Sequence, residues 1–439
     1  MTVSTHTSTR PQLSAERRRV VFSSYLGSTI EYYDFLLYAS ASAIVFPEVF
    51  FSNLEPFAAT IASFGTFAAG YIARPLGGVI FGHFGDTLGR KRVLLASMFL
   101  MGISSTLIGF VPSTASIGSL AAVILVLLRV CQGIAVGGEW GGAALMALEH
   151  SDHKSRGFAA SFVNAGAPSG AALGTFVLSI AAAAMSPESF LSWGWRIPFI
   201  LSFLLLALGL FIRSTISESP IFQAAMDKLD EDERRSPPFP IAEVLRHPRS
   251  VVLTMLGGSS GFALQVLLST FSVRYATDHG ATRSTVLSMF SLASVISVFF
   301  VVGFAALSDR WGRKPVMLCG LLLFLFYLYP HFWLLGTANS VLILIGFTVA
   351  LGIHALIFGP LAAFVSEQFG TGSRYTGASL GYQFATLIGA GFTPSILAYL
   401  YPGAGSSLLP VILFLGIMTV LSGFAIMLTR ETRHADLTA

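Results

Sequence analysis

The sequence predicts an all-α polytopic membrane protein. Of its 439 residues, 54% are hydrophobic and only 11% are charged, and the mean hydropathy is +0.74. This composition is typical of a chain embedded in lipid, because a water-soluble surface needs more charge. Membrane-spanning β-strands would appear as short alternating segments, so the class is all-α.

Twelve apolar segments recur along the chain. A hydrocarbon core about 30 Å thick needs roughly 20 apolar residues per helical crossing. We predict transmembrane helices at residues 20–47, 58–83, 93–111, 117–146, 158–184, 195–212, 250–275, 285–307, 316–335, 341–365, 378–400 and 407–429. The polar, basic segment before them has no cleavable apolar core, so we expect no signal peptide.

Lys and Arg gather in the N-terminal tail and in the loops after the even-numbered helices. The positive-inside rule assigns these segments to the cytoplasm, so both termini are expected there. The net charge of +4 is spread over these short loops and indicates no nucleic-acid partner. Cys131 and Cys319 lack metal-ligand spacing, and we interpret them as packing residues.

The chain is predicted to consist of two related halves. The polar segment 213–249, which contains MDKLDEDERRSPPFP, is the expected cytoplasmic linker. It separates a six-helix bundle at 20–212 from a second one at 250–429, and residues 1–19 and 430–439 form the expected cytoplasmic tails.

Three landmarks recur in both halves in the same order. GDTLGRKR after helix 2 returns as SDRWGRKP after helix 8, and ESP at 218–220 returns as ETR at 431–433. Between them, Glu149 and Arg156 return as Glu367 and Arg374. Duplicated bundles around a central cavity are a transporter architecture, in which the halves rock about the substrate.

Other classes of membrane protein fit the sequence less well. A passive channel or a receptor would not need duplicated loop motifs. A membrane enzyme would need a nucleophile, a metal set or a cofactor motif, and we recognise none. We therefore expect a transporter with no metal and no organic cofactor; the proton is the coupling ion expected from the carboxylates described next.

The segment GSTIEYYDFLLYAS, residues 27–40, places Glu31 and Asp34 inside a predicted membrane helix. Burying an ionisable group at the bilayer centre costs at least roughly 2.5 to 3.5 kcal/mol, so such groups normally face a cavity and serve function. Helical spacing puts both carboxylates and Tyr38 on one face. On predicted helix 4, Arg129 and Gln132 share a face by the same spacing.

Asp34 and Glu31 are the predicted proton-coupling residues. Two carboxylates three residues apart repel when both are ionised, and a low dielectric disfavours the charged form, so one should hold a proton near neutral pH. A substrate carboxylate that competes for Arg129 would then favour protonation of Asp34. The alternative is a fixed salt bridge of either carboxylate with Arg74 or Arg129.

The remaining candidates are less constrained by their positions. Arg74 either lines the cavity or pairs with a carboxylate, and two Arg facing one cavity favour an anionic substrate. Glu139, nearer the cytoplasmic end of helix 4, is predicted to be a gate partner. In the second half, Gln265, Tyr382 and Gln383 are predicted to orient the polar end of a substrate.

The loop GHFGDTLGRKR, residues 82–92, resembles the loop signature of the major facilitator superfamily. The signature positions are Gly82, Asp86, Gly89, Arg90 and Lys91. The second copy has Ala305 at the first glycine position and keeps the residues Asp309, Arg310, Gly312 and Arg313. The physical interpretation is a gate: Asp86 meets an Arg or the positive end of a helix in one conformation and releases it in the other.

Four further strings narrow the resemblance to the metabolite:proton symporter branch, which includes shikimate, α-ketoglutarate, citrate and proline/betaine permeases. They are IEYYDFLLYA, LLRVCQGIAVGGEWGGA, WGWRIPF and ESPIF. The resemblance implies the major facilitator fold, a bacterial inner (plasma) membrane location and a functional monomer. It also implies import of a small organic anion, shikimate-like or a dicarboxylate, together with a proton. The alternatives are a zwitterion importer of the proline/betaine kind and an antiporter that exports a metabolite or drug.

Overall fold

The computed structural model describes residues 10–151, 155–219, 248–370, 373–401 and 405–433, and the single residues 223, 244, 246 and 403. Every regular element in these ranges is helical, as predicted. Most of the predicted linker 213–249 and the ends of both predicted tails lie outside the described residues.

The first half contains six long helical segments and three short connecting helices. The long segments are α1 Arg10–Ile44, α3 Pro56–Leu88, α4 Arg90–Ile108, α6 Leu120–Glu149, α7 Arg156–Ala183, and η2 Phe190–Gly194 continued by α9 Arg196–Ser214. The short ones are α2 Phe46–Phe50, α5 Thr114–Ile117 and α8 Pro187–Ser189.

The second half repeats the pattern of six crossings, two of them interrupted by a π-helical turn. Its segments are α13 Pro248–Val266 with η3 Leu267–Phe271 and α14 Ser272–Asp278, α15 Arg283–Trp311, α16 Arg313–Leu335, α17 Ser340–Ser366, α18 Arg374–Thr386 with η4 Leu387–Gly391 and α19 Thr393–Leu400, and α20 Leu409–Leu428. The twelve predicted crossings are therefore confirmed.

The first crossing begins earlier than predicted. Helix α1 starts at Arg10, whereas residues 1–19 were expected to form a tail. Leu, Ala, Glu, Gln and Arg dominate the added turns, and these residues favour a helix without help from packing. The helix therefore extends beyond the apolar segment that predicted it.

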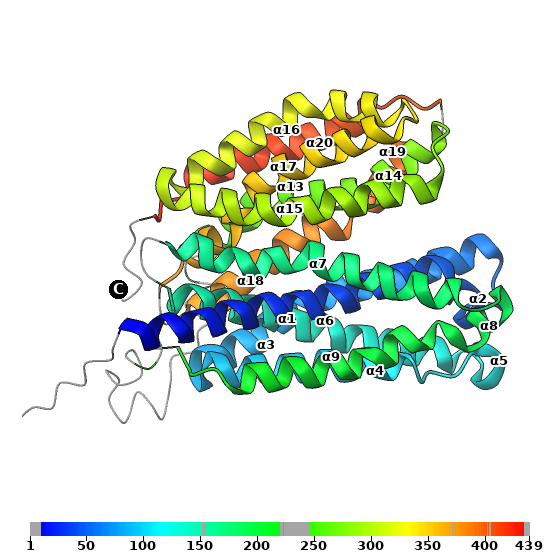
Figure 1. The fold of residues 1–439 in the computed structure, drawn as a ribbon, viewed down its shortest axis with the longest axis horizontal. Helices are drawn as coiled ribbons and strands as arrows, with labels where there is room; N and C mark the ends of the chain where they lie inside the picture. Colours follow the sequence, from blue (N-terminus) through cyan, green and yellow to red (C-terminus); the bar gives the residue numbers. More distant parts are fainter. Residues whose placement is uncertain are drawn as a thin grey trace, which may run out of the picture.

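The two bundles lie side by side, and the helices of the second are tilted relative to those of the first (Figure 1). Helices α3 and α7 of the first half pack against α18 and α15 of the second, so the interface is built from both halves in a related way. The start of α1 and the end of α20 lie at the same end of the molecule (Figure 1). We call this end, which carries Asp86 and Asp309, the motif face, and the other end the opposite face.

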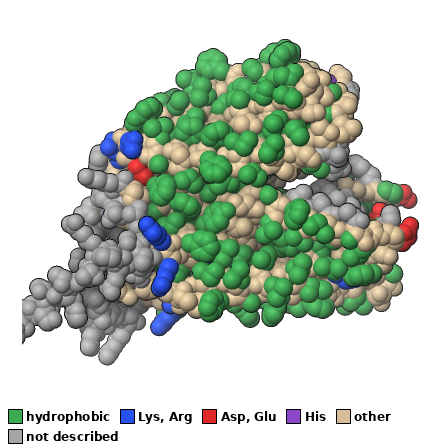
Figure 2. Space-filling view, in the orientation of Figure 1, with side chains coloured by type: hydrophobic (Ala, Val, Ile, Leu, Met, Phe, Trp, Pro, Cys, Tyr) green, Lys and Arg blue, Asp and Glu red, His purple; other side chains and the backbone are tan. Residues whose placement is uncertain are grey.

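The outer surface carries an apolar belt. Hydrophobic side chains cover the flank, Lys and Arg gather at the motif face, and Asp and Glu appear at the opposite face, where a hollow lies between the bundles (Figure 2). Among the described residues, nine helices are long and apolar enough to cross a membrane. This surface is what a lipid environment requires.

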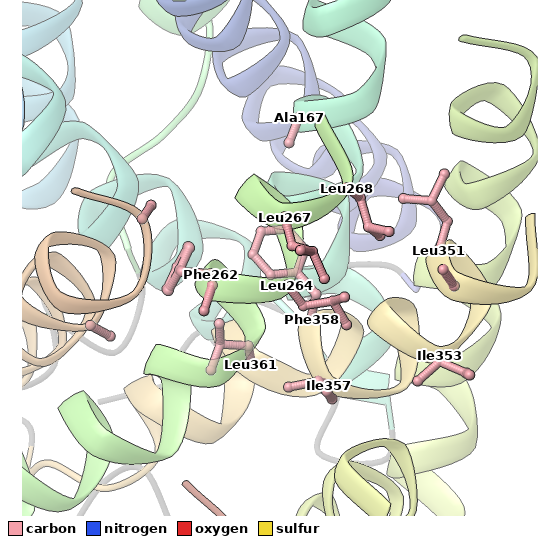
Figure 3. Close-up of a cluster of buried hydrophobic side chains, with 14 of the residues drawn as sticks. Ala167, Phe262, Leu264, Leu267, Leu268, Leu351, Ile353, Ile357, Phe358 and Leu361 are labelled. Carbon is pink, nitrogen blue, oxygen red and sulfur yellow. The ribbon is translucent and has the colours of Figure 1, made fainter. Parts of the chain in front are cut away.

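The core of the second half reaches the interface between the bundles. Side chains of α13 and η3 meet those of α17 beside Ala167 of α7 (Figure 3). The labelled residues of this cluster are Phe262, Leu264, Leu267, Leu268, Leu351, Ile353, Ile357, Phe358 and Leu361. This apolar packing joins α13, η3 and α17 of the second half beside α7 of the first half.

Candidate functional site

A narrow cavity inside the first half brings together most of the predicted charged residues. Helices α1, α3, α4 and α6 contribute its walls, and the space has room for little more than a water molecule. Its lining residues are Glu31, Asp34, Phe35, Gly70, Arg74, Met101, Arg129, Gln132, Gly133 and Val136. The predicted convergence of helix 1 and helix 4 is therefore present in the structure.

Asp34 is held by a serine that the sequence did not identify. Its Oδ1 atom accepts a hydrogen bond from Ser202 of α9 at 2.5 Å, whereas Oδ2 is buried without a hydrogen-bond partner in the described part of the chain. Glu31 is likewise buried, with an unpartnered Oε2 atom. A buried carboxyl oxygen without a donor is best accommodated when the group carries a proton.

Arg129 is oriented by aromatic rings and one amide. Its guanidinium carbon lies 4.2 Å from the ring centre of Tyr38 and 5.0 Å from that of Phe35. Nη1 donates to Oε1 of Gln132 at 3.1 Å, and Gln132 in turn donates to Ser105 at 2.6 Å. The Nε and Nη2 atoms of Arg129 are buried and have no acceptor among the described residues.

Arg74 lies on the same aromatic wall. Its guanidinium carbon is 4.6 Å from the ring centre of Phe35 and 4.3 Å from that of Tyr71. Within the described residues, neither Arg74 nor Arg129 forms an ion pair with Glu31 or Asp34. The fixed salt bridge considered above is thus not formed in this conformation, although the charges are close enough to interact.

Two of the candidates from the second half contact the first half directly. Tyr382 stacks on Trp140 with ring centres 3.4 Å apart, and Gln383 donates weakly to the backbone oxygen of Gly137 at 3.4 Å. Both side chains are buried, whereas Gln265 is partly exposed. Tyr382 and Gln383 therefore close the interface beside the cavity, and their predicted contact with substrate stays a prediction.

Glu139 has a different partner from the one predicted. Its Oε1 atom is 2.8 Å from Nη2 of Arg213 inside the first half, and this pair is separate from the contacts of Asp86. The prediction of a gate partner failed to anticipate this pairing because Arg213 follows the predicted end of helix 6 and was counted as a loop residue. Gly27 is the residue in the sequence that indicates where Arg213 packs, because a Cβ at this position would collide with the Arg213 guanidinium group.

The first loop motif, which is the predicted first gate, joins α3 to the start of α18. Oδ1 of Asp86 accepts from the N–H of Tyr375 at 3.2 Å, and Oδ2 accepts from the N–H and the hydroxyl of Thr376 at 3.1 and 2.9 Å. Asp86 also pairs with Arg90 at 3.1 Å. Gly82 allows the close approach, because a Cβ there would press on the backbone of Thr376. The predicted contacts with an Arg and with a helix N-terminus are both present.

The second loop motif, which is the predicted second gate, repeats this geometry across the interface. Asp309 of α15 accepts from the N–H groups of Gly157 and Phe158 at the start of α7, at 2.9 and 2.8 Å. It pairs with Arg313 at 2.7 Å, and Arg313 also pairs with Glu367 at 3.1 Å. The exposed Arg310 makes none of these contacts. Gate formation therefore does not depend on a glycine at position 305.

A glutamate that follows each bundle caps the N-terminus of the helix after the loop motif, α4 in the first half and α16 in the second. Glu218 accepts from the N–H of Arg90 at 3.0 Å, and Glu431 accepts from the N–H of Arg313 at 3.0 Å. Lys91 donates to the carbonyl of Ser214 at 2.8 Å. The ESP and ETR landmarks therefore have a structural role that the sequence alone did not assign: each supplies a carboxylate to a helix N-terminus.

Gly89 is expected to tolerate no side chain. Its φ of 105° and ψ of 153° lie in a region that is essentially restricted to glycine, at a cost of about 1 to 3 kcal/mol for other residues. We expect Gly89→Ala to lower the thermal unfolding temperature of the purified protein in detergent. Gly65→Ala is the control, because a Cβ at this exposed helical position meets no atom within 4 Å. Equal melting of both variants would contradict the assigned strain.

Two six-helix halves, a duplicated loop motif that contacts the opposite half in each copy, and buried charges beside the interface fit the architecture of a membrane transporter. The comparisons agree. A family described as "Sugar (and other) transporter" matches residues 20–236, and one described as "Major Facilitator Superfamily" matches residues 253–438. The chain belongs to the major facilitator superfamily and, within it, to the metabolite:proton symporter group.

Similar curated proteins are transporters rather than enzymes. The chain is 39% identical to the inner membrane metabolite transport protein YhjE of Escherichia coli, with 96% of each chain covered. It is 37% identical to the shikimate transporter of the same organism, covering 98% of this chain and 100% of that one. A proline/betaine transporter of Salmonella typhimurium is 31% identical over 92% of this chain and 83% of the relative.

A solved structure confirms the fold. The proton:xylose symporter XylE bound to 6-bromo-6-deoxy-D-glucose superimposes with a TM-score of 0.79, covering 97% of this chain and 98% of that one. The sequence identity is 20%, so this likeness concerns the fold.

Proposed function

We propose that the protein imports a small organic anion with a carboxylate group, of the shikimate kind, together with a proton. The observation that supports this proposal most directly is the pair of unsatisfied hydrogen-bond donors on the buried Arg129 side chain. Two of its donor atoms, Nε and Nη2, are buried without an acceptor in the cavity that also holds Asp34. A buried Arg with free donors on one edge suits a carboxylate, which accepts two parallel hydrogen bonds from that edge.

The aromatic wall supports this role. Phe35, Phe67 and Tyr38 hold the guanidinium carbon of Arg129 at 4.2 to 5.0 Å from their ring centres. These contacts partly compensate the buried charge while leaving its in-plane donors free. A bound carboxylate would therefore meet a cation whose orientation is already fixed.

Competition for Arg129 is the proposed basis of coupling. Without substrate, Arg129 and Asp34 line the same cavity, and the positive charge of Arg129 is available to a carboxylate there. A substrate carboxylate neutralises that charge, so Asp34 then retains its proton. Binding of substrate and binding of the proton thus favour each other by the same free energy.

The charge balance favours uptake. A monoanion that enters an inside-negative cell alone is opposed by about 2.3 kcal/mol per 100 mV. A proton carried with it cancels the charge, and each pH unit of gradient contributes about 1.4 kcal/mol. The coupled step is therefore driven by the pH gradient alone.

We place the motif face in the cytoplasm of a bacterial cell, because Lys and Arg gather there (Figure 2). In this orientation the gates close the cytoplasmic side, and the hollow between the bundles faces outward. The similarity to the shikimate transporter and to proline/betaine transporters supports a substrate that bears a carboxylate.

The decisive experiment is an uptake panel in vesicles that contain the purified protein. Labelled shikimate, α-ketoglutarate, citrate and proline are offered with and without an inward proton gradient. We expect gradient-dependent accumulation of a carboxylate, shikimate first. Accumulation driven by an outward proton gradient would instead show exchange of proton for substrate, and an unchanged uptake of every compound would refute proton coupling.

Arg129→Lys is expected to weaken binding of the transported carboxylate by about tenfold or more, since a charged hydrogen bond contributes about 1.5 to 3 kcal/mol. An ammonium keeps the charge and loses the two-pronged contact. Equilibrium binding to the purified protein measures the effect. Arg310→Lys, on an exposed side chain at the motif face, is the matched control. An unaltered affinity would remove Arg129 from the binding site.

A further inference from the structure

The ion pair between Glu139 and Arg213 lies outside the substrate cavity and outside both gates. Glu139 is fully buried and Arg213 is 4% exposed, and their Oε1 and Nη2 atoms are 2.8 Å apart. A buried pair of this kind contributes little to stability, because desolvation of both groups offsets their attraction. Its position, between the cavity and the motif face, therefore calls for another explanation.

A polar stripe on α1 leads from the cavity to this pair and beyond it. Asp34, Glu31, Gly27 and Ser24 follow each other at helical spacing and so lie on one face. Asp34 contacts α9, Arg213 lies directly against Gly27, and Ser24 donates to the carbonyl of Ala143 at 3.2 Å. The stripe thus faces the interior of the first half along its whole length.

A second small cavity continues the stripe to the motif face. Arg213 forms part of its wall, and Lys91 at the start of α4 lines it as well. The other lining residues are Ser23, Ser24, Leu94, Ala143, Met146 and Ile216. Lys91 is partly exposed, so this cavity extends to the end of the helix bundle that carries the gates.

Charged and titratable groups surround Glu139 on several sides. Glu31 of α1 and Arg213 of α9 interact with each other and with Glu139 electrostatically, and Asp34 interacts with Glu139 as well. Arg74 of α3 interacts electrostatically with Glu31, and Tyr375 of α18 interacts electrostatically with Glu139. The carboxylates thus form one electrostatically connected series.

We propose that this series is the proton exit of the transporter, in which Glu139 receives the coupling proton and passes it toward the Ser23–Ser24–Lys91 cavity. The proposal rests on the proton coupling proposed above. It assigns the proton a path inside the first half, separate from the path of the substrate between the halves. The closed gates and the Trp140–Tyr382 stack block that second path in the present conformation.

Each transfer conserves charge. The O–H bond of protonated Asp34 breaks and leaves a carboxylate, while a new O–H bond forms on the Glu31 carboxylate. The O–H bond on Glu31 then breaks as one forms on the Glu139 carboxylate, and each group is neutral while it holds the proton. From Glu139 the proton passes to water at the motif face, and the carboxylate pairs with Arg213 again. The ion pair with Arg213 therefore returns Glu139 to its ionised form and opposes the binding of another proton from the motif face.

The test separates net transport from exchange in vesicles, with the carboxylate that the uptake panel identifies. Exchange of labelled for unlabelled substrate needs no release of the proton, whereas net uptake does. We expect Glu139→Gln to reduce gradient-driven net uptake at least about tenfold and to leave the exchange rate within about twofold. Glu139→Asp should retain much of the net uptake. Glu188→Gln, an exposed acid on the opposite face, is the matched control.

A charge-neutral double variant excludes a purely structural role. If Glu139 only neutralises Arg213, then Glu139→Gln/Arg213→Gln removes both charges and should restore net uptake. If Glu139 carries the proton, the double variant stays defective in net uptake while it still exchanges substrate. Thermal unfolding of each purified variant shows whether the fold is intact.

The two proposals fail in different ways. Net uptake that is gradient-driven in both the wild type and Glu139→Gln would overturn the proton exit and leave proton coupling standing. A wild type that accumulates no panel compound in response to the gradient would overturn both. Loss of net uptake and exchange together in Glu139→Gln, with recovery in the double variant, would also overturn the exit.

Discussion

Asp34→Asn is expected to abolish accumulation driven by a pH gradient while substrate binding persists. Asparagine has the shape of the protonated carboxyl group, so the hydrogen bond from Ser202, 2.5 Å in the native protein, can be kept. It cannot release a proton, however. The variant should bind its carboxylate substrate and exchange it across the membrane, yet fail to concentrate it.

The measurement is substrate accumulation in vesicles at a fixed inward proton gradient, beside equilibrium binding to the purified protein. Asp278→Asn is the matched control, because this carboxylate pairs with Arg274 of the same short helix at 3.7 Å and lies far from the cavity. Unchanged acid-driven uptake by Asp34→Asn would remove Asp34 as the proton carrier.

The sequence predicted the architecture well because membrane crossings and repeated loops are local signals. All twelve crossings are present, and Asp86 and Asp309 meet helix N-termini in related positions. Helix α1 starts at Arg10, ten residues before the predicted start at residue 20, because hydropathy marks only the apolar part of a helix, whereas helix propensity also favours the polar turns before it.

Side-chain pairing was harder to predict. Spacing placed Glu31, Asp34 and Tyr38 on one face of α1, and Arg74 and Arg129, the two arginines expected beside the carboxylates, line the same cavity as Glu31 and Asp34. The partner of each charge depends on how neighbouring helices are rotated, which spacing along one helix does not determine. Arg129 therefore lies over Tyr38 instead of pairing with Asp34, and Ser202 had no sequence signal.

The sequence predicted the depth of Glu139 along its helix, but it did not predict that Arg213 is its partner. Arg213 lies one residue beyond the predicted end of its helix, so hydropathy treated it as a loop residue. The glycine at position 27, one turn before Glu31, was the available signal for a large side chain packed against α1. Glycines opposite buried charges are thus informative about which long side chains cross a bundle.

Asp86→Asn is expected to open the motif face. The carboxylate of Asp86 accepts three hydrogen bonds from Tyr375 and Thr376 of the other half, at 2.9 to 3.2 Å. Charged hydrogen bonds contribute about 1.5 to 3 kcal/mol each, so losing the charge should shift the equilibrium toward the open form by about tenfold or more. Asparagine also loses the attraction to the helix N-terminus and to Arg90.

Distances between spin labels at the motif face report this opening. Labels on the exposed positions Arg92 and Arg310 report from the two halves, in a protein whose Cys131 and Cys319 are replaced. Asp86→Asn should move the distance distribution to longer values, and Asp278→Asn, the same chemical change on the opposite face, should not. Coincident distributions for all three proteins would show that Asp86 does not hold the gate.

The second gate makes the prediction quantitative. Asp309 accepts two hydrogen bonds from the start of α7, at 2.9 and 2.8 Å, and Gly157 and Phe158 supply them from the first half. Because the hydrogen bonds of Asp86 and Asp309 go to different helix N-termini, those of α18 and α7, their effects on the opening equilibrium should add. Asp309→Asn should therefore open the motif face by a smaller or similar amount, and the double variant should open it by the sum of both free energies. A double variant no more open than either single one would mean that the gates act as one cooperative contact.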